Sequence, residues 1–220
     1  MYNLVMKDLK LGIQPMFFVL PILFGLLVLI PSWIYFLVPM YFFWISVPNL
    51  FGNFKTQNDL MFTSLMPVTK KDIVKARVSV IVILEILHIG FAVIFGLVHD
   101  LVYSNSNITY YFFAPSMGFL GLCMVMLAIF NIILIPVYYK TAYKFGRALF
   151  LATSAAMIFA GIVQWLGIQI KSVFDIFNVT IAEHIAIHAS VLIAGVVIFA
   201  AFTLMAYRIA VKRFLKVELL

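Results

Sequence analysis

Charge is scarce in this 220-residue chain: only 10% of its residues are Asp, Glu, Lys or Arg, whereas 65% are hydrophobic. Soluble domains contain about a quarter charged residues, so the composition excludes a water-soluble globular protein. The high hydrophobicity also excludes a disordered chain. A single cysteine, Cys123, excludes a scaffold held by disulfides. The remaining class is an integral membrane protein.

Catalytic and nucleotide-binding motifs are also missing. No glycine is followed by lysine, so the G-x-x-x-x-G-K-[ST] loop that holds nucleotide phosphates is absent and the chain cannot hydrolyse ATP alone. There is no H-E-x-x-H pair, no G-x-S-x-G turn and no cluster rich in Cys or His. We therefore expect a non-catalytic protein that holds no metal and no cofactor of its own.

Hydrophobic runs between the charged residues predict an all-α membrane protein with six spanning helices in one domain. A helix needs about 20 residues to cross the hydrocarbon core, so the uncharged stretch from Leu11 to Phe54 accommodates two. Pro31 separates them, because proline disfavours helix in the residue before it. The predicted spans are residues 13–31, 33–52, 78–98, 112–137, 148–170 and 185–207. No loop between them is long enough for a second folded domain.

The positive charges predict how these spans are oriented. All of the 15 Lys and Arg residues except Lys171 lie before span 1, between spans 2 and 3, between spans 4 and 5, or after span 6. The positive-inside rule places these segments, and both termini, in the cytoplasm. The net charge of +7 then reflects contact with the cytoplasmic leaflet and not binding of nucleic acid.

Two ionisable residues, Glu85 and His88, lie three positions apart on one face of the third predicted span. A charged side chain there costs about 2.5–3.5 kcal/mol on insertion scales, so it needs a partner, a water-filled cavity or a proton. One interpretation is a proton-sensitive or cation-binding point that lines a pathway. The other is that Glu85 pairs with His88, or with Asn131 or Gln164 on a neighbouring helix, and holds helices together.

Two other patterns favour structural roles. Ala152, Ala156 and Ala160 recur at intervals of four and predict close packing of the fifth span inside the bundle. His184 and His188 have a spacing that can chelate a metal. With one acidic residue beside them and no further ligand set, a solvated helix end is the favoured interpretation.

The loop of residues 53–77 predicts a short amphipathic helix between spans 2 and 3. Thr56 and Asp59 fit a capping box at its start, and Thr69 and Asp72 fit a second box from which a new helix runs into span 3. The apolar surface of the short helix is formed by Leu60, Met61, Phe62, Leu65 and Met66, and it ends before Pro67. Such a helix lies in lipid headgroups or inserts into a groove on another protein.

Residues 64–77, SLMPVTKKDIVKAR, resemble the segment between spans 2 and 3 of small ABC-2 type permeases, the membrane subunits of bacterial ABC exporters. The resemblance extends to the chain length, the six spans, the cytoplasmic ends, an amphipathic lead-in at residues 2–11 and the missing nucleotide site. Met66 and Lys70 stand where Leu and Arg are usual, which are mild departures. The resemblance implies a type V-like exporter membrane domain in the bacterial cytoplasmic membrane.

The resemblance also implies partners. In such permeases the short helix is a coupling helix, seated in a cleft of a separate ATPase subunit that binds ATP and Mg²⁺. Here it corresponds to about residues 58–66. The implied contacts with the ATPase are Asp59, Leu60, Phe62, Leu65, Met66 and Pro67. A second permease, identical or different, is implied because rocking between inward-facing and outward-facing states needs two halves.

The cargo implied by the resemblance is hydrophobic or amphipathic. The 23 Phe residues and the short outer loops are similar to those of exporters of lipids, hydrophobic drugs or amphipathic cytolytic peptides such as phenol-soluble modulins. Two other functions stay open from the sequence. One is an ion- or proton-coupled carrier centred on Glu85 and His88, and the other is a membrane immunity or anchor protein.

Overall fold

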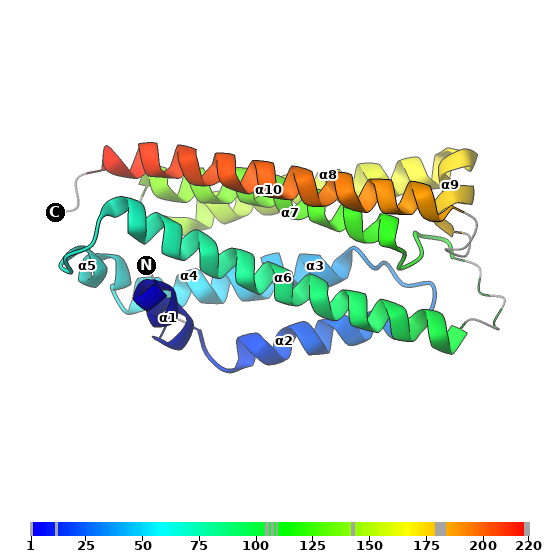
Figure 1. Ribbon diagram of the computed structural model, residues 1–220, viewed down its shortest axis with the longest axis horizontal. Coiled ribbons are helices and arrows are strands. Elements are labelled where there is room, and N and C mark those ends of the chain that lie inside the picture. Colours follow the sequence, from blue (N-terminus) through cyan, green and yellow to red (C-terminus); the bar gives the residue numbers. More distant parts are fainter. Residues whose placement is uncertain are drawn as a thin grey trace.

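The computed structural model describes residues 2–11, 13–103, 106, 108, 110–141, 144–178 and 184–217, and every regular element in these residues is a helix. The long helices run along a common axis as a bundle (Figure 1). In chain order the elements are α1 (Tyr2–Leu11), α2 (Met16–Gly25), the 3₁₀ helix η1 (Leu26–Leu29), α3 (Leu37–Tyr41), the π-helix η2 (Phe42–Ser46), α4 (Val47–Thr56), α5 (Asp59–Ser64), α6 (Lys70–Tyr103), α7 (Met117–Thr141), α8 (Phe145–Gln169), α9 (Lys171–Asn178) and α10 (Ile185–Leu215).

Four helices in the described part of the chain, α6, α7, α8 and α10, are long and apolar enough to cross a membrane. They correspond to the last four predicted spans. The six-span count is not confirmed, because predicted span 13–31 is the shorter apolar helix Met16–Leu29 and predicted span 33–52 is divided among α3, η2 and α4. Span 4 also begins later than predicted. Ser116 Oγ accepts a hydrogen bond from the Phe119 amide (3.3 Å) and caps α7 there.

The predicted break at Pro31 is confirmed. η1 ends at Leu29, and Ser32 adopts a left-handed φ of 57°, which reverses the chain. The Tyr35 hydroxyl donates to the Ile30 carbonyl (2.9 Å) across this turn. Residues 16–29 and 37–56 therefore run antiparallel along the bundle (Figure 1), and the ring of Phe24 stacks on that of Tyr41 at 4.3 Å.

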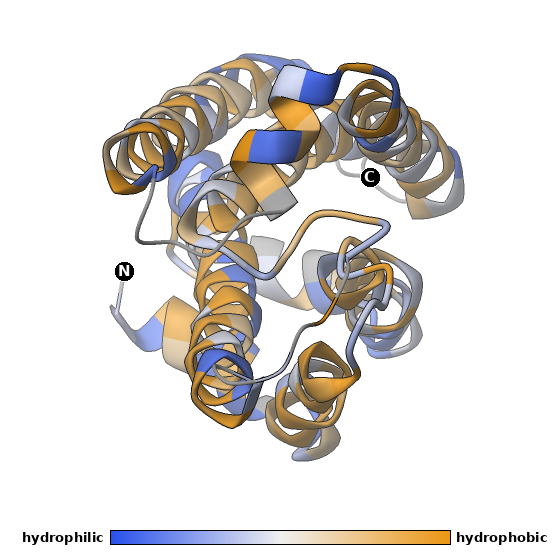
Figure 2. Ribbon diagram, turned by 90° about the vertical axis from the view of Figure 1, so that its right-hand side faces the viewer, coloured by the Kyte–Doolittle hydropathy of each residue, from blue (hydrophilic) through white to orange (hydrophobic). Residues whose placement is uncertain are grey.

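The two ends of the bundle differ in charge. The first residues of α6 and α8, the last residues of α7 and α10, and α1 all lie at the end that carries α5, whereas α9 lies at the opposite end (Figure 1). The basic segments grouped by the charge map therefore share one end. Figure 2, viewed from the α9 end, shows that hydrophobic residues predominate on the long helices, whereas α9 carries both hydrophilic and hydrophobic residues. The side of the membrane that each end faces stays a prediction.

Small residues set the closest helix contacts. On α8, Ala148, Ala152, Ala156 and Ala160 are all buried, which confirms the predicted internal packing of this helix. On α7 and α10, a Cβ atom on Gly121 or Gly195 would overlap the backbone of the opposite helix. These glycines therefore allow α7 and α10 to approach more closely than any side chain would permit.

The predicted solvated helix end at His188 is wrong. His188 is fully buried, its Nδ1 accepts a hydrogen bond from the Gly118 amide (3.3 Å), and its Nε2 lies 3.0 Å from the Ile176 carbonyl. Because Gly118 is a donor, Nε2 carries the proton and donates to Ile176. Both ring nitrogens are used, so His188 joins α10 to α7 and α9 and has no lone pair left for a metal.

Candidate functional site: the helix between α4 and α6

The short helix α5 links α4 to α6 at the basic end of the bundle (Figure 1). It covers six residues, within the predicted range 58–66, and begins after Asn58, whose φ of 48° lies in the left-handed region. The first predicted capping box is wrong. Thr56 is the last residue of α4 and its hydroxyl donates back to the Asn53 carbonyl (3.0 Å), which satisfies the end of that helix and not the start of α5.

The second predicted capping box is confirmed at the start of α6. Thr69 Oγ1 accepts a hydrogen bond from the Asp72 amide (3.1 Å) and donates to Asp72 Oδ2 (2.6 Å). The reciprocal bonds satisfy an amide that the helix itself leaves free. They fix where α6 begins, and thereby the point at which the α5 segment joins the longest helix of the bundle.

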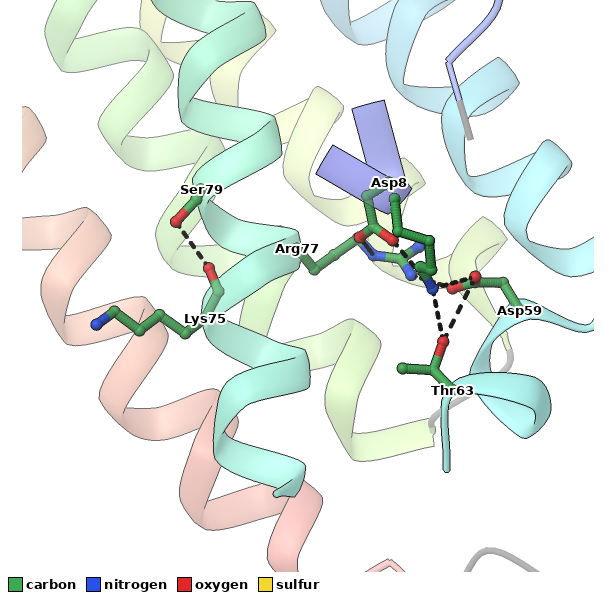
Figure 3. A network of polar contacts seen from close by, with 7 residues as sticks. Asp8, Asp59, Thr63, Lys75, Arg77 and Ser79 are labelled. Atoms are coloured by element: carbon green, nitrogen blue, oxygen red, sulfur yellow. Dashed lines mark hydrogen bonds and ion pairs between the residues drawn. The ribbon is translucent and has the colours of Figure 1, made fainter. Parts of the chain in front are cut away.

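Charged side chains from α1, α5 and α6 meet where these three helices come together (Figure 3). Arg77 donates from Nη2 to Asp59 Oδ2, and its Nε forms an ion pair with Asp8 Oδ2 at 3.0 Å. Lys7 Nζ lies 2.6 Å from Asp59 Oδ1 and 3.2 Å from Asp8 Oδ1, and it donates to Thr63 Oγ1 (2.6 Å). We call Lys7, Asp8, Asp59, Thr63 and Arg77 the α5 network. Two positive and two negative charges balance within it.

Burial makes the α5 network sensitive to the loss of any partner. Arg77 is 3% exposed, and its guanidinium lies 3.2 Å from the centre of the Phe54 ring on α4. Burial raises the pKa of Asp59, but Arg77 and Lys7 outweigh this effect and the net pKa is lowered. At Asp8 burial is the stronger effect, so its pKa is raised despite Arg77 and Lys7. The network therefore stabilises the charged form of Asp59 more than that of Asp8.

Apolar side chains on α5 and just after it are exposed. Phe62 is 58% exposed and Leu65 is 79% exposed, and Pro67 is exposed just beyond them. Met66 is partly exposed. These four of the predicted ATPase contacts are therefore fully or partly accessible to a partner, and we call them the α5 surface (Phe62, Leu65, Met66 and Pro67).

The other two predicted contacts are placed differently. The side chain of Leu60 lies outside the described residues. Asp59 is 9% exposed, and its carboxylate lies in the α5 network. Asp59 was predicted to contact the ATPase, but in the structure it links α5 to α1 and α6, because Lys7 and Arg77 attract its carboxylate into the bundle. Arg77 was counted in the sequence only as a positive-inside charge. Its spacing from Val74 and Ile81, which share its buried face, was the available signal.

The intramembrane pair Glu85 and His88 does not interact as a pair. Asn131 Nδ2 of α7 donates to Glu85 Oε2 (2.9 Å) and to Thr203 Oγ1 of α10 (3.3 Å), so the pairing of Glu85 with Asn131 is the alternative that the structure supports. His88 Nδ1 bonds the Leu84 carbonyl of its own helix (2.9 Å). Glu85, Asn131 and His88 are all buried, and the first two link α6, α7 and α10.

Residues 3–214 match the family model described as ABC-2 family transporter protein. The matched range covers nearly all of the chain and includes α1 except Tyr2, the α5 network and the α5 surface. No curated protein and no solved structure matches the chain.

Proposed function

The chain belongs to the ABC-2 family of transporter proteins, and on this premise we propose that it is the permease subunit of an ATP-driven exporter. The sequence lacks a loop for nucleotide phosphates, so a separate subunit has to bind ATP and Mg²⁺ and supply the energy. Family membership supports a multi-pass transport component. The direction of transport, out of the cell, is part of the proposal.

The observation that carries the proposal is the exposed α5 surface at the basic end of the bundle. Covering large apolar side chains such as Phe62 and Leu65 with a partner is favourable, because it removes apolar surface from water. A short helix with exposed apolar side chains fits a groove on another protein. We assign this surface to the cleft of the ATPase subunit. Leu60 joins the proposed contacts from its position in the sequence alone.

The α5 network supports a route by which force reaches the bundle. Asp59 ties α5 to Arg77 on α6, and Lys7 ties it to α1. A displacement of α5 by the ATPase would therefore move α6 with it, since paired and buried charges resist separation. α6 extends for 34 residues, the full length of the bundle, so the motion is carried as a rigid-body tilt.

We propose six spans, with residues 16–29 and 37–56 as the first two. The second segment is helical throughout its 20 residues and rises about 30 Å, the thickness of the hydrocarbon core. The first is shorter and relies on apolar neighbours such as Ile13 and Ile30 at its ends. The basic end is assigned to the cytoplasm of a bacterial cell membrane. Two permeases, identical or different, complete the transporter.

The cargo is proposed to be hydrophobic or amphipathic, with amphipathic cytolytic peptides such as phenol-soluble modulins as the leading candidate. The apolar composition and the short connections at the α9 end support this choice. ATP hydrolysis by the assembled transporter should rise on addition of such peptides. No response to peptides, with a response to lipids, would replace peptide cargo by lipid cargo.

Copurification tests the docking of an ATPase on α5. Leu65→Asp places a charge on the α5 surface, so an ATPase that copurifies with the wild-type chain in mild detergent should be lost. The matched control is Leu215→Asp, at another exposed leucine that ends α10 at the same end of the bundle. It should retain the ATPase. Equal retention in both variants would refute docking on α5.

The alternative functions make different predictions. A carrier centred on Glu85 and His88 would exchange ions in liposomes as the purified chain alone, without nucleotide. An immunity or anchor protein would give resistance to a toxic peptide without measurable efflux. Either result, with no effect of Leu65→Asp, would replace the permease proposal.

A further inference from the structure

The polar cluster between α6, α7 and α10 has more hydrogen-bond acceptors than donors. Glu85 and Asn131 are each 0% exposed, and one Asn131 amide group serves both Glu85 Oε2 and Thr203 Oγ1. The second oxygen of each side chain, Glu85 Oε1 and Asn131 Oδ1, has no donor within the described part of the chain. Two buried acceptors of one bonded pair are therefore left without a hydrogen.

The charge of Glu85 is not balanced either. The ion pairs found among the described residues involve Lys7, Asp8, Asp59 and Arg77, and none includes Glu85. His88 lies one turn along α6, but it is bonded to Leu84 and forms no ion pair with Glu85. A carboxylate in this position would be an unpaired anion in an apolar bundle, which is the costliest arrangement for a buried group.

The helices packed around Glu85 offer no nearby cation to change this balance. α2 and η1 contain no ionisable side chain, and α3 contains only Tyr41. On α6 the nearest cation, Arg77, is paired with Asp8 and Asp59 more than two turns away. The remaining ionisable groups on these packed elements are Tyr2, Lys7, Asp8 and Lys10 on α1, Cys123, Tyr138, Tyr139 and Lys140 on α7, and His188, Tyr207, Arg208, Lys212 and Arg213 on α10.

We propose that Glu85 is a proton-binding site: it carries a hydrogen on Oε1 and donates it to Asn131 Oδ1. A neutral carboxyl group and a primary amide form two reciprocal hydrogen bonds, and the first of these, from Asn131 Nδ2 to Glu85 Oε2, is already in place at 2.9 Å. One proton thus satisfies both unpaired acceptors and removes the unpaired charge.

The bound proton makes the cluster a clamp between three helices. Glu85 belongs to α6, Asn131 to α7 and Thr203 to α10, so the reciprocal pair and its bond to Thr203 hold all three together. If the helices separate and water reaches Glu85, the carboxyl group ionises and the clamp is released. Proton binding therefore favours the closed arrangement described here.

Infrared spectroscopy of the purified full chain in lipid nanodiscs tests the protonation state directly. At neutral pH the wild type should show a protonated-carboxyl C=O band that shifts in D₂O and is absent from Glu85→Gln. The matched control Asp72→Asn alters a carboxylate held by Thr69 at the start of α6, and it should leave this band unchanged. The inference is overturned if Glu85→Gln removes carboxylate bands instead, whether or not those bands respond to exchange of Na⁺ for K⁺.

Thermal melting as a function of pH gives a second test. Glu85→Gln replaces the O–H donor with an N–H donor, so it should fold and melt near the wild type at neutral pH. A group that binds its proton more tightly in the folded state makes stability fall as pH rises, so the wild type should lose melting temperature on alkalinisation and Glu85→Gln should lose less. Parallel curves would overturn the inference. Neither test needs nucleotide or a partner, so failure here leaves the proposed function intact.

Discussion

Individual charged residues gain their roles from the partners that the fold provides. Asp8 and Asp59 both contact Arg77 and Lys7, yet burial raises the pKa of Asp8, whereas at Asp59 the two cations outweigh burial and lower the pKa. By linkage, Asp59 contributes stability above its unfolded pKa that is lost as pH falls through its folded pKa. The raised pKa of Asp8 has the opposite effect: Asp8 contributes stability below its unfolded pKa, and this contribution is lost as pH rises through its folded pKa.

Neutralising the two carboxylates should therefore have unequal effects at pH 7. Asp59→Asn should destabilise the purified chain by about 2 kcal/mol, since it leaves Arg77 and Lys7 short of a counter-charge. Asp8→Asn should cost less, because burial already disfavours its charge. Thermal melting measures both, with the exposed Asp175→Asn as a control that should not change. An equal or larger loss for Asp8→Asn would contradict this order.

At the scale of elements, the ends of α4 and α6 show that the same sequence pattern has different outcomes. Thr69 caps α6 through reciprocal bonds with Asp72, whereas Thr56 only bonds back to Asn53 within α4. Thr69→Ala should therefore lower stability by about 1 kcal/mol, the usual value of an N-cap, and Thr56→Ala should be close to neutral. Thermal melting of the two variants measures the difference, and equal melting temperatures would show that the Thr69 cap does not stabilise α6.

The crossing of α7 and α10 depends on two glycines in contact. Gly121→Ala should destabilise the bundle by about 1–3 kcal/mol, since its Cβ would overlap the backbone of α10 at Val191. Gly161→Ala on α8 is the matched control, because a Cβ there meets nothing within 4 Å. It should be neutral or slightly stabilising. The prediction fails if the two variants, purified in detergent, have the same melting temperature.

At the scale of the whole molecule, the two ends of the bundle should face opposite sides of the membrane. Leu65 and Tyr111 are both more than two-thirds exposed. Leu65 directly follows α5, whereas Tyr111 lies between the end of α6 and the start of α7, at the opposite end of the bundle. In a Cys123→Ala background, a cysteine at position 111 should react with a membrane-impermeant maleimide in intact cells. A cysteine at position 65 should react only after permeabilisation. The reverse labelling pattern would invert the proposed topology and remove α5 from contact with a cytoplasmic ATPase.

Features set by neighbours in the sequence were predictable. The apolar runs identified four helices long enough to span a membrane, Pro31 marked a chain reversal, and the Thr69 capping box marked the start of α6. Each depends on transfer of apolar groups out of water or on bonds within a few residues. The grouping of basic segments at one end also followed, because antiparallel helices return the chain to the same side each time.

Contacts between distant residues were decided only by tertiary structure. Lys7 and Asp59 lie 52 residues apart, and Asn131 lies 46 residues from Glu85. The sequence showed that Glu85 needed a partner but offered several candidates, and it indicated no partner for Lys7. The choice depends on which helices pack together and at what height, and on the small residues, such as Gly121, that permit the approach. Burial then turned Asp59 inward and left Phe62 and Leu65 outside, which no local pattern distinguishes.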